Sequence, residues 1–249
     1  MLKILIVSLA AAAGHWHPPV HLSWQWELSK PPAAPYLQVG MYDVDGQETP
    51  ARTVRALHRR QVRVSCYLSA GSWERWRPDA RRYPKALLGT PLDGWPGERW
   101  LDVRHLRGAL ARILRARLDV CARKGFDAVE PDNVDGYLQK TGFAIHARDQ
   151  LAFNRWLARE AHRRGMAIFL KNDPDQAAKL EPSFDGALVE QCVQYRECHR
   201  FRPFARAHKP VLDVEYRGRM RTICRLTKPL GVSAMRKRLQ LDRPRTACP

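Results

Sequence analysis

Short apolar runs alternate with amphipathic stretches along the chain after its first 14 residues. Eight of these runs are predicted to be strands, and several are continuously apolar, as expected for strands that are covered on both faces. The predicted strands are Trp24–Leu28, Val39–Val44, Val62–Leu68, Phe126–Glu130, Met166–Leu170, Gly186–Glu190, Pro210–Val214 and Leu230–Ala234.

Helices are predicted between the strands. Apolar residues recur at helical spacing from Leu106 to Cys121, and again from Leu151 to Ala161. A third helix is expected to open at Thr49-Pro50, with the threonine as N-cap. Strands that alternate with helices indicate a parallel sheet, and eight strands in 249 residues favour a single-domain α/β protein, a (β/α)8 TIM barrel. A doubly wound open sheet is the alternative, but no glycine-rich phosphate loop follows any strand.

The barrel domain is expected to span residues 15–241. Within it, residues 71–100 form the longest irregular stretch, rich in Trp, Pro and Gly, and should lie over the C-terminal face of the barrel because they follow the third strand. Residues 242–249 are expected to form a frayed C-terminal tail.

The first 14 residues read MLKILIVSLAAAAG, one Lys followed by an apolar run that ends in small residues. This pattern is typical of a cleaved signal peptide, so we expect a secreted or periplasmic protein. The run is too short to span a bilayer, and no transmembrane segment is predicted. A buried first strand or an uncleaved anchor is the alternative.

The six Cys residues are even in number, and an oxidising compartment would permit disulfides. Cys192 and Cys198 are close enough to close a short loop, whereas Cys66 and Cys121 are interpreted as buried thiols. No CxxC spacing occurs, and His15, His17 and His21 are more typical of a flexible polar leader than of a metal site. We therefore expect no metal and no cofactor.

The chain carries 43 Lys and Arg against 25 Asp and Glu, a formal net charge of +18. Such an excess ordinarily indicates a polyanionic partner. Here no nucleic-acid motif accompanies it, and the basic residues are spread over many helices, often in C-terminal turns where they complement the helix dipole. We expect no specific nucleic-acid partner, and a monomer.

Carboxylates gather where the predicted strands end, which in a barrel is the functional face. Paired acids there can shift one another's pKa, so that one serves as general acid and another as nucleophile or base, as cleavage of a glycosidic bond requires. The acids at strand exits are Asp43, Asp45, Glu130, Asp132, Asp135, Asp173, Glu190 and Glu215, with Lys171, Asn133, Asn172 and Gln191 nearby.

Two other uses of these acids stay open. Asp149, Asp173 and Asp175 could be helix caps. A carboxylate cluster could also hold Mg²⁺ or Ca²⁺, although the lack of His at the strand ends argues against zinc. Among the eight Trp residues, the core is favoured for Trp100 and Trp156, and the cleft for at least one of Trp26, Trp73 and Trp95.

The segments WQWELS, CYLSAGSWERWRPD, DGWPGERWLDVR, GFDAVEPDNVDGY, QLAFNRWLAREAHRRG, FLKND, ALVEQC and PVLDVEY together resemble glycoside hydrolase family 114 from about Trp24 to Tyr216. The resemblance implies a secreted barrel hydrolase, an endo-α-1,4-polygalactosaminidase that cleaves galactosamine-containing exopolysaccharide with retention. It places the nucleophile at Asp132 and the acid/base at Glu190. The expected substrate-binding residues are Trp26, Asp43, Asp45, Trp73, Glu130, Asn133, Asp135, Lys171, Asp173 and Glu215.

Two other functions compete with this interpretation. A non-catalytic carbohydrate-binding barrel would keep the Trp residues but lose the catalytic pair, and both acids are present. A polyanion-binding protein is suggested by the net charge alone, and it predicts a steep salt dependence of binding.

Overall fold

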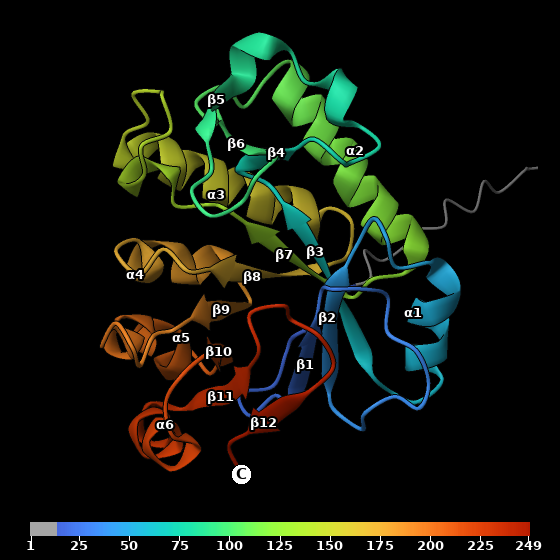
Figure 1. Cartoon of the computed structure of the whole chain (residues 1–249), viewed down its shortest axis with the longest axis vertical. Coiled ribbons are helices and arrows are strands. Elements are labelled where there is room, and N and C mark those ends of the chain that lie inside the picture. The colour runs from blue at the N-terminus through green and yellow to red at the C-terminus, as the bar shows by residue number, and fades with distance from the viewer. Residues whose placement is uncertain (1–13) are drawn as a thin grey trace, which may run out of the picture.

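The computed structural model describes residues 14–249, so most of the predicted signal peptide, residues 1–13, lies outside the described residues. Eight parallel strands form the main sheet in chain order (Figure 1). They are β1 (Trp24–Glu27), β2 (Met41–Asp45), β3 (Arg63–Ser69), β7 (Ala128–Asp132), β8 (Ala167–Lys171), β9 (Gly186–Glu190), β10 (Val211–Glu215) and β11 (Val232–Lys237). All eight predicted strands are confirmed, as is the barrel.

Helices cover the outside of this sheet: α1 (Ala51–His58), α2 (Ala109–Lys124), α3 (Ala147–His162), α4 (Ala177–Leu180), α5 (Arg202–Arg206) and α6 (Met220–Thr227), with short 3-10 turns between them. Pro50, not Thr49, is the N-cap of α1, so this helix begins one residue later than predicted. Among residues 14–249, no α-helix follows β1 or β11. Pro31, Pro32 and Pro35 explain the first gap, because proline interrupts helical hydrogen bonding.

The stretch 71–100 is more ordered than the sequence suggested. It contains a separate antiparallel sheet in the order β4 (Ser72–Glu74), β6 (Glu98–Leu101) and β5 (Leu88–Pro91). Its strands have only three or four residues each, too few to produce a hydrophobic period. We call this three-stranded sheet the accessory sheet.

Alternation along the strands divides the core into two clusters. In β8, Ala167 and Phe169 belong to a cluster inside the barrel, whereas Ile168 and Leu170 belong to a larger cluster beneath the helices. Because successive side chains of a strand point to opposite faces, the last residue, Lys171, returns to the interior. The same alternation carries the final side chains of β7 and β9 inward.

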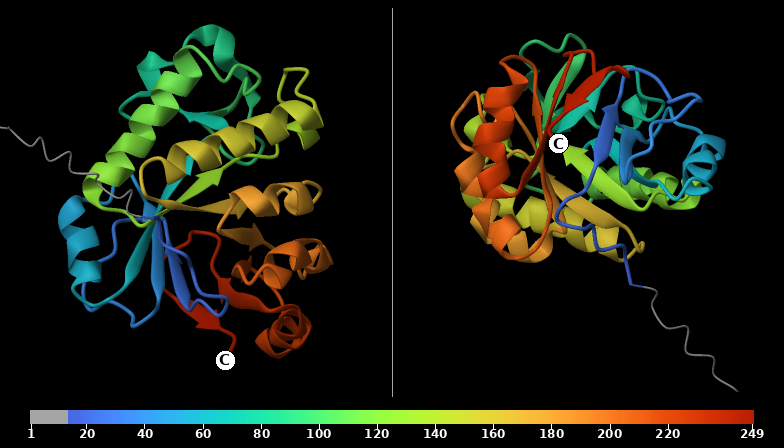
Figure 2. Two further views of the ribbon diagram at one scale, coloured as in Figure 1. Left: turned by 180° about the vertical axis from the view of Figure 1, so that it is seen from behind. Right: turned by 90° about the horizontal axis from the view of Figure 1, so that it is seen from below.

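The two edges of the main sheet, at β1 and β11, meet along a seam of the barrel that the C-terminal residues close. Strand β12 (Arg245–Ala247) pairs antiparallel with β11, and it lies beside β1 in the views of Figure 2. Arg245 Nη1 donates to Trp24 O at 2.9 Å, and Gln25 Nε2 donates to Arg243 O at 2.7 Å. A Cys224–Cys248 disulfide holds this segment to α6. Residues 242–249 are therefore not a frayed tail but part of the barrel wall.

Two further disulfides are present. The Cys192–Cys198 bridge follows the sequence prediction. The buried-thiol interpretation of Cys66 and Cys121 was wrong, because β3 and α2 pack together and bring these two residues into a disulfide. Gly46 makes room for that bridge, since a Cβ there would lie 2.0 Å from Cys66 Sγ.

No helix among residues 14–249 is both long enough and apolar enough to cross a membrane.

Candidate functional site

Three adjacent strands deliver three ionisable side chains to one point at their carboxyl ends. Asp132 ends β7, Lys171 ends β8 and Glu190 ends β9. Immediately after each of them the chain turns through a left-handed residue, Asn133, Asn172 or Gln191, with φ between 50° and 60°. This conformation is uncommon for residues other than glycine, and it concentrates at functional sites, where backbone strain is tolerated.

Lys171 is the centre of the group. Its side chain is 2% exposed, and Nζ lies 3.1 Å from Glu130 Oε1. Because Nζ also lies 3.0 Å from Asp132 Oδ1 and 3.2 Å from Glu190 Oε2, these two oxygens are at most about 6 Å apart. Burial alone would lower the pKa of Lys171, but the surrounding carboxylates outweigh it and hold this pKa well above its usual value. The lysine is thus a fixed positive charge.

Two tyrosines fix the other side of the carboxylates. Tyr67 Oη donates to Asp132 Oδ2 at 3.0 Å, and Tyr216 Oη donates to Glu190 Oε1. Burial, followed by the neighbouring carboxylate charge, raises the pKa of each tyrosine, so both hydroxyls keep their protons. The backbone N–H of Asn133 also donates to Asp132 Oδ1, at 2.8 Å. Both carboxylates are therefore held in one orientation.

A second pair of acids lies beneath the first. Asp43 and Glu130 are completely buried, and Trp26 Nε1 donates to Glu130 Oε2 at 3.0 Å. Burial raises the pKa of Asp43 to about 7. Burial and the Asp43 charge raise the pKa of Glu130 well above its usual value. Protons are thus retained in this layer at neutral pH, and Lys171, which lies 4.8 Å from the centre of the Trp26 ring, supplies the positive charge above it.

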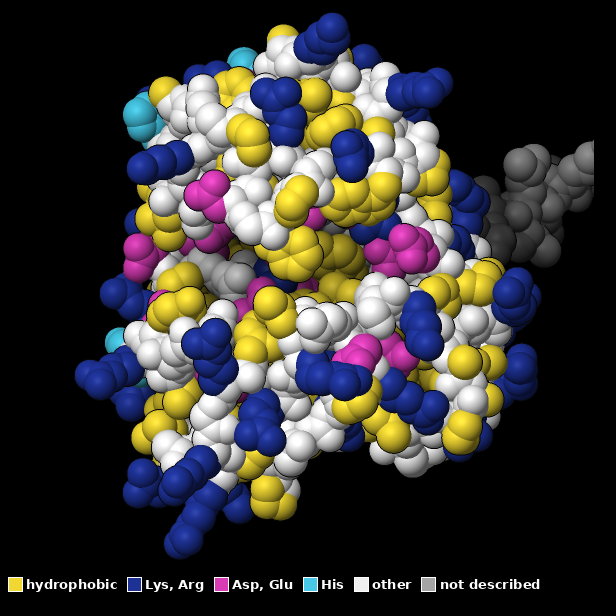
Figure 3. Space-filling view, viewed as in Figure 1, with side chains coloured by type: hydrophobic (Ala, Val, Ile, Leu, Met, Phe, Trp, Pro, Cys, Tyr) yellow, Lys and Arg dark blue, Asp and Glu magenta, His cyan; other side chains and the backbone are white. Residues whose placement is uncertain are grey.

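These side chains form the floor of a cleft of about 930 Å³. Figure 3 shows a hollow in this face of the molecule, with acidic and hydrophobic side chains in and around it, while Lys and Arg side chains are scattered over the outer surface. Seven predicted site residues line the cleft: Trp26, Asp45, Asp132, Asn133, Asp135, Lys171 and Glu190. Seven of the twelve predicted site residues are therefore brought together at one face of the barrel.

Five predicted residues do not line the cleft. Asp43 and Glu130 lie beneath it, as described. Glu215 points out of the barrel, where it accepts the N–H of Val193 at 2.8 Å. Asp173 is buried beside Tyr137, whose hydroxyl donates to it at 2.9 Å. Trp73 packs against the core and donates to Ala80 O at 3.0 Å.

The remaining tryptophans follow the sequence prediction in part. Trp100 and Trp156 are buried, as expected, although Trp100 also reaches the cleft. Trp26 and Trp95 line the cleft.

Several cleft residues were missed by the sequence reasoning. Tyr67 could have been found, because Ser65, Tyr67 and Ser69 alternate as polar residues along β3. Tyr216 directly follows β10 and lies two residues after Val214, which belongs to the cluster inside the barrel. Alternation therefore predicts that the Tyr216 side chain also points inward. Glu74, Trp76, Arg77 and Glu98 come from the accessory sheet and its loops, where no sequence signal marks them.

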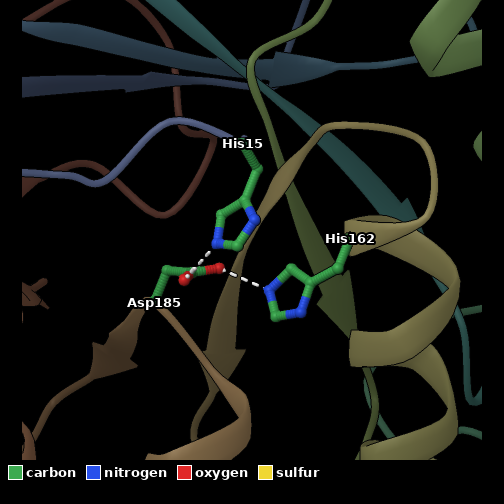
Figure 4. A group of neighbouring side chains, drawn as sticks. All are labelled: His15, His162 and Asp185. Carbon is green, nitrogen blue, oxygen red and sulfur yellow. Dashed lines mark hydrogen bonds and ion pairs between the residues drawn. The ribbon is translucent and has the colours of Figure 1, made fainter. Parts of the chain in front are cut away.

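Among residues 14–249, two groups of side chains could in principle hold a metal ion, and neither fits one well. At the opposite end of the barrel, His15 and His162 each place Nε2 2.8–2.9 Å from one oxygen of Asp185 (Figure 4). Their rings are stacked with 11° between the planes, so no single ion lies in the plane of both. The second group includes Cys192, whose sulfur is in a disulfide. The histidine pair instead attaches the N-terminal segment to the barrel.

Comparison with known proteins relates the chain to glycoside hydrolases, both by sequence and by structure. The family model of glycoside-hydrolase family GH114 matches residues 7–249. The crystal structure of Aspergillus fumigatus Ega3 in complex with galactosamine has a TM-score of 0.89 and 33% sequence identity, over 94% of this chain and 98% of that one. The glycoside hydrolase domain of PelA from Pseudomonas aeruginosa has a TM-score of 0.71 and 13% identity, over 90% and 98% of the two chains, which shows the fold alone. No curated protein matched the sequence.

Proposed function

The chain belongs to glycoside hydrolase family GH114 and is a glycosidase, and on this premise we propose that it cleaves α-1,4-linked, galactosamine-containing polysaccharide with retention of configuration. Asp132 is the nucleophile and Glu190 the acid/base. The observation that carries the proposal is the arrangement of these two carboxylates around Lys171. The similarity to Ega3, whose structure contains galactosamine, supports the choice of sugar.

The spacing of the carboxylates favours retention. Retaining enzymes place the two groups about 5–5.5 Å apart, whereas inverting enzymes need about 6.5–9.5 Å to admit a water molecule. The common contact with Lys171 Nζ, 3.0 Å from Asp132 Oδ1 and 3.2 Å from Glu190 Oε2, brings these facing oxygens close together, which is compatible with the short separation of retaining enzymes. In the first step Asp132 attacks the anomeric carbon while Glu190 protonates the departing oxygen. In the second step Glu190 removes a proton from water, which releases the sugar from Asp132.

Lys171 couples the two steps because it contacts both carboxylates. In the free enzyme the ammonium is shared between Asp132 and Glu190. When Asp132 becomes a neutral ester its charge is lost, and Lys171 stays beside Glu190, the group that must remove a proton from water in the second step.

The test is hydrolysis of partly de-acetylated polygalactosamine, with products followed by mass spectrometry and the anomer of the first product followed by NMR. Asp132→Asn and Glu190→Gln should each lower the rate by at least about 10³-fold while the fold survives. Asp119→Asn, an acid on α2 outside the cleft, is the matched control and should retain full activity. Near-normal activity in either site variant would contradict the assignment, and a first product of inverted configuration would contradict retention.

Export is the remaining part of the proposal. We infer that residues 1–14 are a signal peptide and that the mature chain is secreted or periplasmic. Mass spectrometry of the protein recovered outside the cytoplasm should give an N-terminus near His15. An intact Met1 in the exported protein would contradict cleavage.

A further inference from the structure

The accessory sheet brings exposed aromatic side chains to the edge of the cleft. Six large hydrophobic side chains are strongly exposed among the described residues, and four of them line the cleft: Trp76, Trp95, Leu138 and Leu239. Trp76 is 50% exposed and Trp95 is 53% exposed. Apolar surface gathered at a polar cleft is typical of a binding site rather than of packing.

Local structure holds the two tryptophans beside one carboxylate. Trp95 lies in the turn before β6, and its carbonyl accepts the N–H of Glu98 at 3.1 Å. Trp76 packs against Gly97, where an added Cβ would lie 3.2 Å from the Trp76 ring. Glu98, which follows Gly97, also lines the cleft. Trp95 in this turn, Trp76 against Gly97 and Glu98 at the start of β6 are therefore neighbours, and all three line the cleft.

Most other acids of the cleft already have partners. Arg77 pairs with Asp45 and Glu74, each at 2.7 Å. Arg117 Nη1 lies 3.3 Å from Oε2, the second carboxylate oxygen of Glu74. Asp132 and Glu190 are each held by Lys171 and a tyrosine, as described above. These acids have little capacity left to bind a cationic ligand.

Glu98 is different. Its Oε2 accepts the hydroxyl of Ser72 at 2.5 Å, and within residues 14–249 no donor contacts its Oε1. The residue is only 7% exposed and belongs to the cleft lining, so little of its surface meets open solvent. Burial, with the charges of Glu74 and Asp132, raises the pKa of Glu98 to about 7, against the opposing effects of Ser72 and Arg77. A cation is the partner that this carboxylate lacks.

Hydrogen bonds place this acid close to the reactive pair. Ser72 Oγ, which contacts Glu98, also accepts from Asn133 Nδ2 at 3.2 Å. Asn133 in turn contacts Asp132 through its backbone N–H. Ser72 and Asn133 thus connect Glu98 to the nucleophile, so a sugar unit that contacts Glu98 would lie near the reactive pair.

We propose that Trp76, Trp95 and Glu98 form a subsite that selects a hexosamine unit with a free amino group. The tryptophans contact the apolar face of the sugar ring, and Glu98 Oε1 accepts from its ammonium group. An N-acetylated unit carries no charge there and leaves Glu98 without a partner. This inference rests on the proposed function and adds to it the residues that distinguish the free amine from the acetamide.

The experiment measures binding by calorimetry in the inactive Glu190→Gln background, since Glu190 is not among the groups that perturb Glu98. The probes are galactosamine oligosaccharides and N-acetylgalactosamine oligosaccharides of equal length. Glu98→Gln, which keeps the Ser72 hydrogen bond, should weaken binding of the free-amine oligosaccharide about 10-fold and leave the N-acetylated one within about 2-fold. Glu48→Gln, at an exposed acid of the same cleft, is the matched control and should change neither.

Trp95→Ala separates the aromatic contribution from the charge. This side chain is exposed, so its removal should not affect folding, and it should weaken both oligosaccharides by the same factor. In the background protein, binding of the free-amine oligosaccharide should also weaken as the pH falls from 7.5 to 5.5, because Glu98 takes up a proton. Glu98→Gln should reduce that dependence.

The outcomes separate this inference from the function on which it rests. If the background protein binds neither oligosaccharide, the galactosamine substrate is wrong, and the subsite fails with it. If it binds the free-amine oligosaccharide and Glu98→Gln changes nothing, or weakens both probes equally, only the subsite is overturned. Unchanged affinities in Trp95→Ala overturn the aromatic contribution.

Discussion

Replacing Lys171 with methionine tests the electrostatics of the cleft floor. The change removes an ammonium group that lies 3.0–3.2 Å from the carboxyl groups of Glu130, Asp132 and Glu190, and methionine fills a similar volume. Removing one partner of a buried ion pair costs about 3–5 kcal/mol. In a domain of this size 1 kcal/mol corresponds to about 2–4 °C in Tm, so the variant should unfold at least about 6 °C below the wild type at neutral pH.

The pH dependence of this loss of Tm shows whether the missing ammonium charge causes it. The ammonium opposes the upward pKa shift that burial causes at Asp43 and Glu130, so without it the pKa values of these two carboxyls rise still further above their unfolded values. Groups of this kind stabilise the fold fully below the unfolded pKa, near 4, and lose that contribution as the pH rises through the folded pKa. The Tm difference between Lys171→Met and the wild type should therefore be smallest near pH 4.5 and should grow towards pH 8.

Thermal unfolding followed by circular dichroism at several pH values is the assay. Lys140→Met is the matched control, since Lys140 is exposed at the same cleft, and its Tm should stay within about 1 °C of the wild type. A Lys171→Met difference under about 2 °C that does not vary with pH would refute the view that the ammonium neutralises this cluster.

Three further predictions address the scaffold. Gly71→Ala places a Cβ 1.6 Å from Asn133 O, so kcat in the hydrolysis assay should fall more than about 10-fold through displacement of the nucleophile loop; a wild-type kcat would contradict this. Replacing both Cys224 and Cys248 with Ser opens a 24-residue loop and should lower the free energy of unfolding by about 3 kcal/mol in a denaturant titration; an unchanged midpoint would contradict it. Asp185→Asn should be destabilised at pH 7, and its gap to the wild type should shrink as the pH falls below about 4. Burial raises the pKa of Asp185, but the contact with His162 outweighs burial and lowers this pKa, and a lowered pKa gives stability that is lost as the pH falls from the unfolded pKa through the folded one. A gap that persists at pH 3 would count against this.

The eight barrel strands could be predicted because each is a compact apolar run between amphipathic helices. Their last residues could be predicted as functional because strand exits share one face of a barrel. Which exits point inward was harder to decide. Strand β10 reads VLDVE, and apolar residues occupy positions on both of its faces. The alternation of apolar and polar residues therefore does not indicate that Glu215 points out of the barrel.

Other features depend on tertiary packing that no local pattern records. The Cys66–Cys121 bridge joins residues 55 positions apart, and it forms because α2 packs over β3. Glu98 and its two tryptophans lie in strands and turns too short to show a period, so the accessory sheet looked irregular in the sequence. The role of Lys171 also emerged only from distances, because a lysine after an apolar strand does not reveal three carboxylates around it.

The seam of the barrel governs when a growing chain can finish folding. Trp24 Nε1 donates to Ser233 O, and Lys237 Nζ donates to Gln25 Oε1, contacts that span 209 and 212 residues. A ribosome makes β1 about two hundred residues before β11 and β12, so the first strand waits for these later strands before its outer edge is covered. Such long-range closure is slow, and an uncovered strand edge readily pairs with another chain. A chain released before residue 232 would keep that edge open, and aggregation rather than a partly active barrel is the expected fate of the fragment.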